Sequence, residues 1–222
     1  MSTTVAALYT SPAIVESVSQ LFQEIVPDVR LVNVVDGSLI QDVIAANEVT
    51  QAVERRLLRY YLACEDTGAS VILNTCSSIG EATNRLARYI RVPIINIDNE
   101  MARKAVNSAS RIAVLATLPT TLGPTVRLVQ RSAEEAGTSV KIVEGLAEGA
   151  FDALISGDHA EHDRILSETA KTSAEEADVV VLAQGFMARM ERDLQELIGK
   201  PVLSSPRSGI ESVRAFLKGN GT

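Results

Sequence analysis

The sequence repeats a set of landmarks at a spacing of about 108 residues. Any α/β chain repeats its strands at some spacing, so the informative part is that four pairs of positions agree within two residues. The pairs are Pro12 and Pro119, Asn33 and Ile142, Cys76 and Gln184, and Pro93 and Pro201. The repeat predicts that the chain is built from two halves of one plan.

Short runs rich in β-branched residues alternate with longer segments of helical periodicity along the chain. This alternation is typical of βα units and of a parallel sheet. The runs predict strands at Val5–Tyr9, Arg30–Val35, Ser70–Asn74, Ile94–Ile97, Arg111–Ala116, Ser139–Val143, Val179–Ala183 and Val202–Ser204. The predicted class is therefore α/β, with two similar doubly wound parallel-sheet halves related by pseudo-twofold symmetry.

The repeat also predicts where the halves divide. We expect a first half of residues 1–98 plus 208–222 and a second half of residues 99–207, because the last apolar helix, Ile210 to Leu217, follows the second half's final strand and is expected to return to the first. Open parallel sheets bind ligands at the carboxyl ends of their strands. We therefore expect an active-site cleft between the two halves.

Composition excludes several classes of function. The net charge is -7 and no cluster of Lys and Arg is present, which argues against nucleic acid as a partner. No apolar run approaches the roughly 20 residues that span a bilayer, so no membrane association is expected. The start of the chain lacks the features of a signal peptide, and its two cysteines predict free thiols in a cytoplasmic protein.

The segment around Cys76 has the strongest chemical character. A buried strand runs into polar residues and then into a helix, and these residues are Asn74, Thr75, Cys76, Ser77 and Ser78. Backbone N–H groups at a helix start bind anions and lower the pKa of a thiol toward the reactive thiolate. The alternative is a small buried cysteine beside a helix cap. Cys64 lies within a helical apolar pattern and is expected to fill the core.

With these residues in place, the chain resembles the aspartate/glutamate racemase superfamily, which includes glutamate, aspartate and hydantoin racemases, maleate isomerases and arylmalonate decarboxylases. The resemblance spans the chain. It rests on the Asn-Thr-Cys-Ser-Ser run ending at Ser78, on the turn 116–120, and on the strand 181–187. It implies an isomerase without a cofactor, a small carboxylate substrate, and a homo-oligomer. No metal is expected, because His159 and His162 are three residues apart rather than the four of a zinc-binding helix.

The resemblance also implies roles for single residues. In the family two opposed cysteines exchange a proton at an α-carbon while hydroxyls and amides hold the carboxylate, and Cys76 matches the first cysteine. Neutral donors can stabilise both a carboxylate and the enolate formed from it. The expected substrate-binding residues are Thr10, Ser11, Asn74, Thr75, Ser77, Ser78, Thr117, Thr120 and Gly185.

Gln184 stands where the family has its second cysteine, and an amide cannot accept and return a proton near neutral pH. Three interpretations remain open. In the first, Cys76 works as the single base or nucleophile of an isomerase, decarboxylase or other lyase, with Gln184 as a hydrogen-bond donor. In the second, another group such as His162 supplies the proton. In the third, the chain binds a small acid without catalysis.

Overall fold

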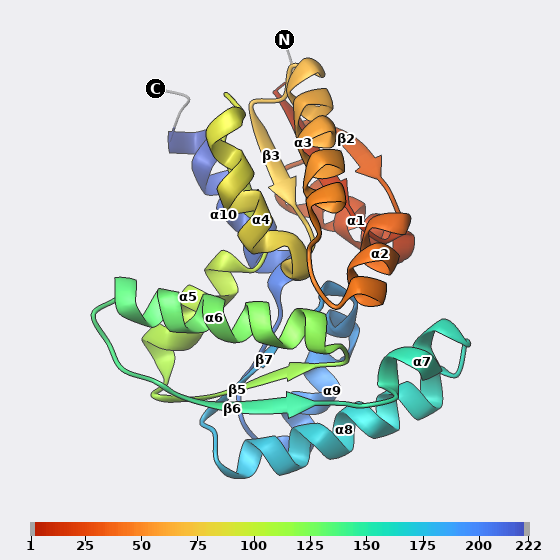
Figure 1. Cartoon of the computed structure of the whole chain (residues 1–222). Coiled ribbons are helices and arrows are strands. Elements are labelled where there is room, and N and C mark those ends of the chain that lie inside the picture. Colours follow the sequence, from red (N-terminus) through yellow and green to blue (C-terminus); the bar gives the residue numbers. More distant parts are fainter. Residues whose placement is uncertain (1–2, 220–222) are drawn as a thin grey trace. The chain divides into compact units, whose positions relative to one another are not determined.

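The computed structural model describes residues 3–219, which form two compact units (Figure 1). The first unit is Met1–Asp98 with Pro206–Thr222, and the second is Asn99–Ser205. The ends of the predicted first half, residues 1–2 and 220–222, lie outside the described residues. Across residues 3–219, every helix is too short or too polar to cross a bilayer.

The first unit is a parallel four-stranded sheet in the order β2-β1-β3-β4. Its strands are β1 (Thr4–Tyr9), β2 (Arg30–Val35), β3 (Val71–Asn74) and β4 (Ile94–Asn96). Its α-helices are α1 (Val15–Ile25), α2 (Ser38–Ala46), α3 (Gln51–Asp66), α4 (Gly80–Leu86) and α10 (Ser205–Gly219), and its 3-10 helices are η1 (Pro12–Ile14), η2 (Ser77–Ile79) and η3 (Ala87–Tyr89). Helices α3 and α1 lie on opposite faces of the sheet (Figure 1).

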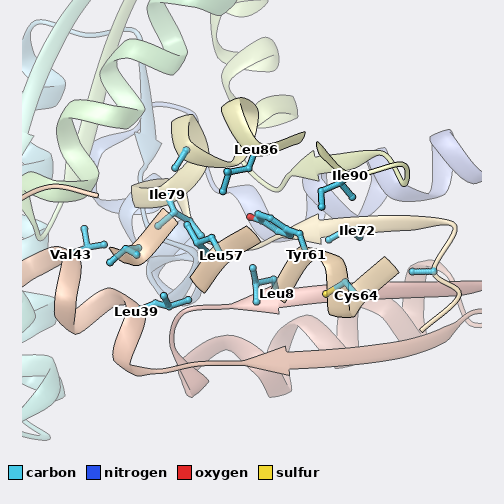
Figure 2. Packing of buried hydrophobic residues seen from close by; sticks show 14 residues of the cluster. Leu8, Leu39, Val43, Leu57, Tyr61, Cys64, Ile72, Ile79, Leu86 and Ile90 are labelled. Carbon is cyan, nitrogen blue, oxygen red and sulfur yellow. The ribbon is translucent and has the colours of Figure 1, made fainter. Parts of the chain in front are cut away.

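The core on the α3 face of this unit is drawn in Figure 2. Leu8 of β1 and Ile72 of β3 pack against Leu57, Tyr61 and Cys64 of α3, all fully buried. Burial of such side chains contributes about 1.5–3 kcal/mol each. The prediction that Cys64 fills the core is confirmed, and burial raises the pKa of its thiol to about 11.

The second unit repeats the same topology, with the order β6-β5-β7-β8 and all strands parallel. Its strands are β5 (Arg111–Ala116), β6 (Lys141–Leu146), β7 (Val179–Leu182) and β8 (Val202–Leu203). Its helices are α5 (Asn99–Ser108), α6 (Pro119–Glu135), α7 (Ala150–Ile155), α8 (His159–Glu175), η4 (Gly185–Met190) and α9 (Glu191–Ile198). One core joins the sheet to α5 and α6, and another joins its opposite face to α7, α8 and α9 (Figure 1).

The α/β class and the two similar parallel sheets are confirmed, and each predicted strand is present. The largest difference is β6, which was expected at Ser139–Val143 and lies at Lys141–Leu146. Gly145 allows this placement, since a Cβ there would lie 2.3 Å from Leu115 Cδ2. The strand register also makes Glu144, rather than Ile142, the counterpart of Asn33.

Candidate active site

The site residues of the first unit gather at the carboxyl edge of its sheet. Thr10 directly follows β1, Cys76 comes two residues after β3, and Asp98 comes two residues after β4. Because β1 pairs with β3 and β3 pairs with β4, the ends of these strands lie side by side. Thr10 and Asp98 are each 4% exposed, and Cys76 is partly buried. This edge is where open parallel sheets bind ligands.

Three donors favour the thiolate of Cys76, and they are the Thr10 hydroxyl and the backbone N–H groups of Ser78 and Ile79. The Ile79 N–H also donates to the backbone carbonyl oxygen of Cys76, at 3.4 Å. Burial raises the pKa of this thiol, the three donors lower it, and the nearby Asp98 carboxylate raises it, with a net result above the ordinary value. The predicted donors at the helix start are present. The predicted net lowering of the thiol pKa is wrong, because burial outweighs those donors.

Asn74 fixes the backbone on both sides of the thiol. Its Nδ2 donates to the carbonyl oxygen of Cys76 at 3.1 Å and to Asn96 Oδ1 at 2.9 Å, while its Oδ1 accepts from the Cys76 N–H at 3.4 Å. Asn96 Nδ2 in turn donates to Asn84 Oδ1 at 2.8 Å. Both amide protons of Asn74 are therefore used within the protein. These bonds hold Asn74 against the backbone of Cys76, and its expected contact with a substrate carboxylate stays a prediction.

Thr75 is likewise bonded within the protein, and its expected role in substrate binding stays a prediction. Its backbone N–H and its hydroxyl both donate to the carbonyl oxygen of Leu8, at 3.1 and 2.9 Å. A carboxylate needs donors, and Thr75 has given both of its donors to β1. Ser11 acts as the N-cap of η1, accepting from the Ala13 N–H at 3.3 Å, which is the capping alternative for a turn residue. Ser77 and Ser78, both buried, begin η2 beside Cys76.

Sequence reasoning missed Asp98 and Asn96, which are both buried at the end of β4. Asp98 acts electrostatically on Cys76, and Asn96 links Asn74 to the exposed Asn84. The signal was available, because Asn96 lies near the end of the predicted strand Ile94–Ile97 and Asp98 directly follows that strand, at the edge where ligands bind.

The second unit places Gln184 at the position that Cys76 holds in the first. Each residue follows the third strand of its unit and is the N-cap of a 3-10 helix with extended backbone, at φ -113 and ψ 138 for Gln184 and φ -125 and ψ 117 for Cys76. Gln184 Nε2 donates to Thr117 Oγ1 at 2.9 Å, and its Oε1 accepts from the Thr117 N–H at 3.0 Å. The amide of Gln184 is therefore held in one orientation by Thr117.

Two other predicted residues lie near this pair in sequence and structure. Thr120 is in the first turn of α6, and its buried Oγ1 has no hydrogen-bond partner within residues 3–219. Gly185 is the first residue of η4, directly after Gln184. Thr117, Thr120 and Gly185 thus lie at the carboxyl edge of the second sheet, where the sequence placed them.

His162 lies in the first turn of α8, which Asp158 caps by accepting from the Glu161 N–H at 3.0 Å. The imidazole is fully buried, with Nδ1 2.8 Å from Asp163 Oδ1 and 3.1 Å from Arg189 Nη2. An acid or base must reach the proton that it transfers. The ring has no exposed surface in this structure and lies 6.0 Å from the Phe186 ring of η4, centroid to centroid, so the role of His162 as an acid or base stays a prediction.

The described part of the chain, residues 3–219, contains two histidines and two cysteines. In that part of the chain no group of three or more His, Cys, Asp or Glu side chains is arranged to hold a metal ion.

Comparison with known proteins identifies the class of enzyme to which this fold and site belong. The model of the Asp/Glu/Hydantoin racemase family matches residues 6–213. The chain therefore belongs to this family of racemase-type isomerases. A search of curated proteins found no match.

Solved structures show the same fold at low sequence identity. A glutamate racemase from Bacillus anthracis is similar with a TM-score of 0.74 and 14% identity, covering 99% of this chain and 83% of that chain. For an allantoin racemase from Klebsiella pneumoniae the TM-score is 0.72 with 14% identity, covering 98% and 88%. For an aspartate racemase of Picrophilus torridus it is 0.70 with 12% identity, covering 92% and 89%.

Proposed function

We propose that this chain is a cofactor-independent enzyme that moves a proton at the carbon next to a carboxylate in a small acid or amino acid, with Cys76 as the base. The observation that carries the proposal is the set of three donors on the Cys76 thiol, from Thr10, Ser78 and Ile79. Hydrogen bonds to the charged form stabilise it. A thiol that only filled space would need none of them.

The chemistry follows from the thiolate. It removes the proton from the α-carbon, and the electron pair left behind moves onto the carboxylate as an enolate. Returning a proton to the carbon from the opposite face gives the mirror-image product. Neutral hydrogen-bond donors stabilise the enolate as its charge develops. Ser77, Ser78, Thr117 and Thr120 are the proposed donors, by likeness to the family and by their place at the carboxyl edges of the sheets.

The raised thiol pKa gives this proposal a pH dependence. Burial stabilises the neutral thiol of Cys76, so the thiolate fraction near neutral pH is small and rises tenfold for each pH unit below the thiol pKa. Activity that depends on the thiolate rises with pH in the same proportion. Turnover that is flat across the neutral range would contradict a Cys76 base.

Gln184 favours a second candidate, which is a one-thiol decarboxylase or other lyase on the same scaffold. The two hydrogen bonds between Gln184 and Thr117 fix an amide that carries no transferable proton near neutral pH. A single base returns the proton to the face from which it was taken, which exchanges the α-proton without inverting the carbon. A racemase needs a second proton donor on the other face.

The test is exchange of the α-proton in deuterium oxide, measured separately for both enantiomers of a panel of amino acids, dicarboxylates and hydantoins. Exchange with inversion supports the racemase, exchange with retention supports the one-base enzyme, and loss of carbon dioxide identifies a decarboxylase. Cys76→Ser is expected to abolish each of these, because the pKa of a hydroxyl is far too high for a base. Equal turnover by Cys76→Ser and the parent would rule out Cys76 as the base.

A non-catalytic binder is the remaining alternative, and thiol labelling separates it. Alkylation of Cys76 is followed against pH with the buried Cys64 as the internal reference. Protection of Cys76 by one compound supports a site that holds substrate against the thiol. Binding of that compound without any exchange or turnover would favour the binder.

A further inference from the structure

Tyr61 is a fully buried phenol on α3 that the proposed chemistry does not use. Its hydroxyl lies 2.6 Å from Thr83 Oγ1 on α4, and Thr83 Oγ1 donates to the carbonyl oxygen of Ile79 at 3.0 Å. A threonine hydroxyl has one proton. Since that proton goes to Ile79, Tyr61 is the donor of the other bond, and the chain of hydrogen bonds runs from Tyr61 through Thr83 to Ile79.

The chain ends at the segment that contacts the reactive thiol. Ile79 is the last residue of η2, and its backbone N–H donates to the backbone carbonyl oxygen of Cys76 at 3.4 Å. The N–H groups of Ile79 and Ser78 also favour the Cys76 thiolate. The carbonyl oxygen of Ile79 accepts from Thr83 while the N–H of the same residue donates to Cys76, so a change in the orientation of Ile79 changes how η2 holds Cys76.

The surroundings of Tyr61 are those of an apolar core. Figure 2 shows it among Leu57, Ile72 and Leu86, where a phenylalanine ring would make the same contacts. Burying a hydroxyl is costly unless it is hydrogen-bonded. Burial raises the pKa of Tyr61 far above its ordinary value, so the phenol keeps its proton and stays a donor over the working pH range.

We propose that Tyr61 is a positioning residue that acts through Thr83 and the Ile79 carbonyl to hold the N–H groups of Ser78 and Ile79 on the Cys76 thiol. Its effect is to stabilise the thiolate relative to the thiol. The consequence for turnover rests on the proposed function, whereas the effect on the thiol is a property of the first unit alone.

Other groups act on the same thiol and are held constant in the test. Asp98, after β4, disfavours the thiolate by its negative charge, and Thr10, after β1, favours it by donating a hydrogen bond. Cys64 and Cys76 both help to raise the pKa of Tyr61 by their charge when they are ionised. None of these groups is altered by removing the Tyr61 hydroxyl.

The experiment measures the rate of iodoacetamide alkylation at Cys76 against pH, with Cys76 and Cys64 resolved by peptide mass spectrometry. Tyr61→Phe is expected to raise the apparent pKa of Cys76 and to slow its alkylation near neutral pH about three- to tenfold, the effect of one lost hydrogen bond. The matched control is Tyr60→Phe, because the neighbouring phenol on α3 donates to Asp36 at 2.6 Å instead. Tyr60→Phe is expected to leave the Cys76 profile unchanged.

A second pair of variants keeps the test decisive if Tyr61→Phe folds poorly. Thr83→Val removes the middle hydroxyl and is expected to reproduce the shift, while Thr83→Ser keeps that hydroxyl and is expected to retain the parent profile. A parent-like Cys76 profile in folded Tyr61→Phe or Thr83→Val would overturn the proposal. A shifted profile with no detectable turnover by the parent protein would support the positioning role and count against the proposed function instead.

Discussion

After their third strands the two sheets continue with the same backbone arrangement, and they differ in the residue that caps the following 3-10 helix. In the first unit Thr10 donates to the thiol of Cys76, and in the second Thr117 bonds the amide of Gln184. Cys76 and Gln184 both cap a 3-10 helix with extended backbone. The fold thus provides the same hydrogen-bonding threonine twice, and of the two capping residues Cys76 can carry a proton whereas Gln184 cannot near neutral pH. Fold likeness to racemases therefore cannot decide by itself whether this chain inverts its substrate.

The sharpest way to break the comparison is to make the first edge like the second with Cys76→Gln. We expect loss of α-proton exchange by about 10²- to 10⁴-fold, the usual contribution of a positioned base. The measurement is exchange in deuterium oxide with the substrate found by screening. A melting temperature close to that of the parent would show that the glutamine is accommodated as Gln184 is. Retained exchange in Cys76→Gln would show that Cys76 is not the base.

Removing the amide of the second edge should act on stability more than on chemistry. Gln184→Leu leaves the Thr117 N–H without its acceptor at a position that is 4% exposed. A buried donor without a partner costs about 1–3 kcal/mol of the free energy of unfolding, measurable by urea denaturation. Gln184→Glu keeps an acceptor oxygen and serves as the control. If Gln184→Leu were as stable as the parent, the two bonds would not be what holds this edge together.

The two threonines give a paired test of smaller size. Thr10→Val removes a donor to the thiolate, so the pKa of Cys76 rises and its alkylation near neutral pH slows by up to about tenfold. Thr117→Val removes the hydroxyl that accepts from Gln184 and is expected to cost about 1 kcal/mol of stability without any change in the Cys76 profile. Equal profiles for the two variants would mean that Thr10 does not stabilise the thiolate.

The fold was predictable because its signals are local and repeated. Strands such as Arg30–Val35 and Arg111–Ala116 are short runs rich in aliphatic residues, and the structure has them with the predicted bounds. The prediction ended strand β6 before Glu144 and Gly145, because charged residues and glycines are uncommon in strands. In the structure both residues pair with β5, and the side chain of Leu115 lies close to Gly145.

The site was predictable only in part, because sequence shows which polar groups reach an edge and not what each one bonds. Cys76 and Gln184 were placed by their distance from strand ends. Asn74 donates to Asn96 and Thr75 donates to Leu8, and both acceptors are distant in sequence from their donors. A local sequence pattern does not show such bonds. The sign of the Cys76 pKa shift required the degree of burial, which a local pattern does not contain.

The smallest predicted difference between the units lies at the end of their second strands. The N–H of Asp36 donates to Tyr9 at 3.0 Å and that of Ala147 donates to Ala116 at 2.8 Å, so these two positions correspond. Burial raises the pKa of the Asp36 carboxyl, and hydrogen bonds from Tyr60, Ser38 and Arg56 lower it by more. The net result is a pKa well below the ordinary value.

A carboxyl with a lowered pKa in the folded state stabilises the protein above its unfolded pKa of about 4, and the contribution is lost as pH falls toward the folded value. Asp36→Asn is therefore expected to cost about 1 kcal/mol at neutral pH and progressively less as the solution is acidified, measured by urea denaturation across that range. Ala147→Ser, at the corresponding position of the second unit, introduces no titrating group and should change stability equally at every pH. A cost of Asp36→Asn that did not shrink in acid would show that the ion pair with Arg56 adds nothing to folding, and would remove this difference between the two edges.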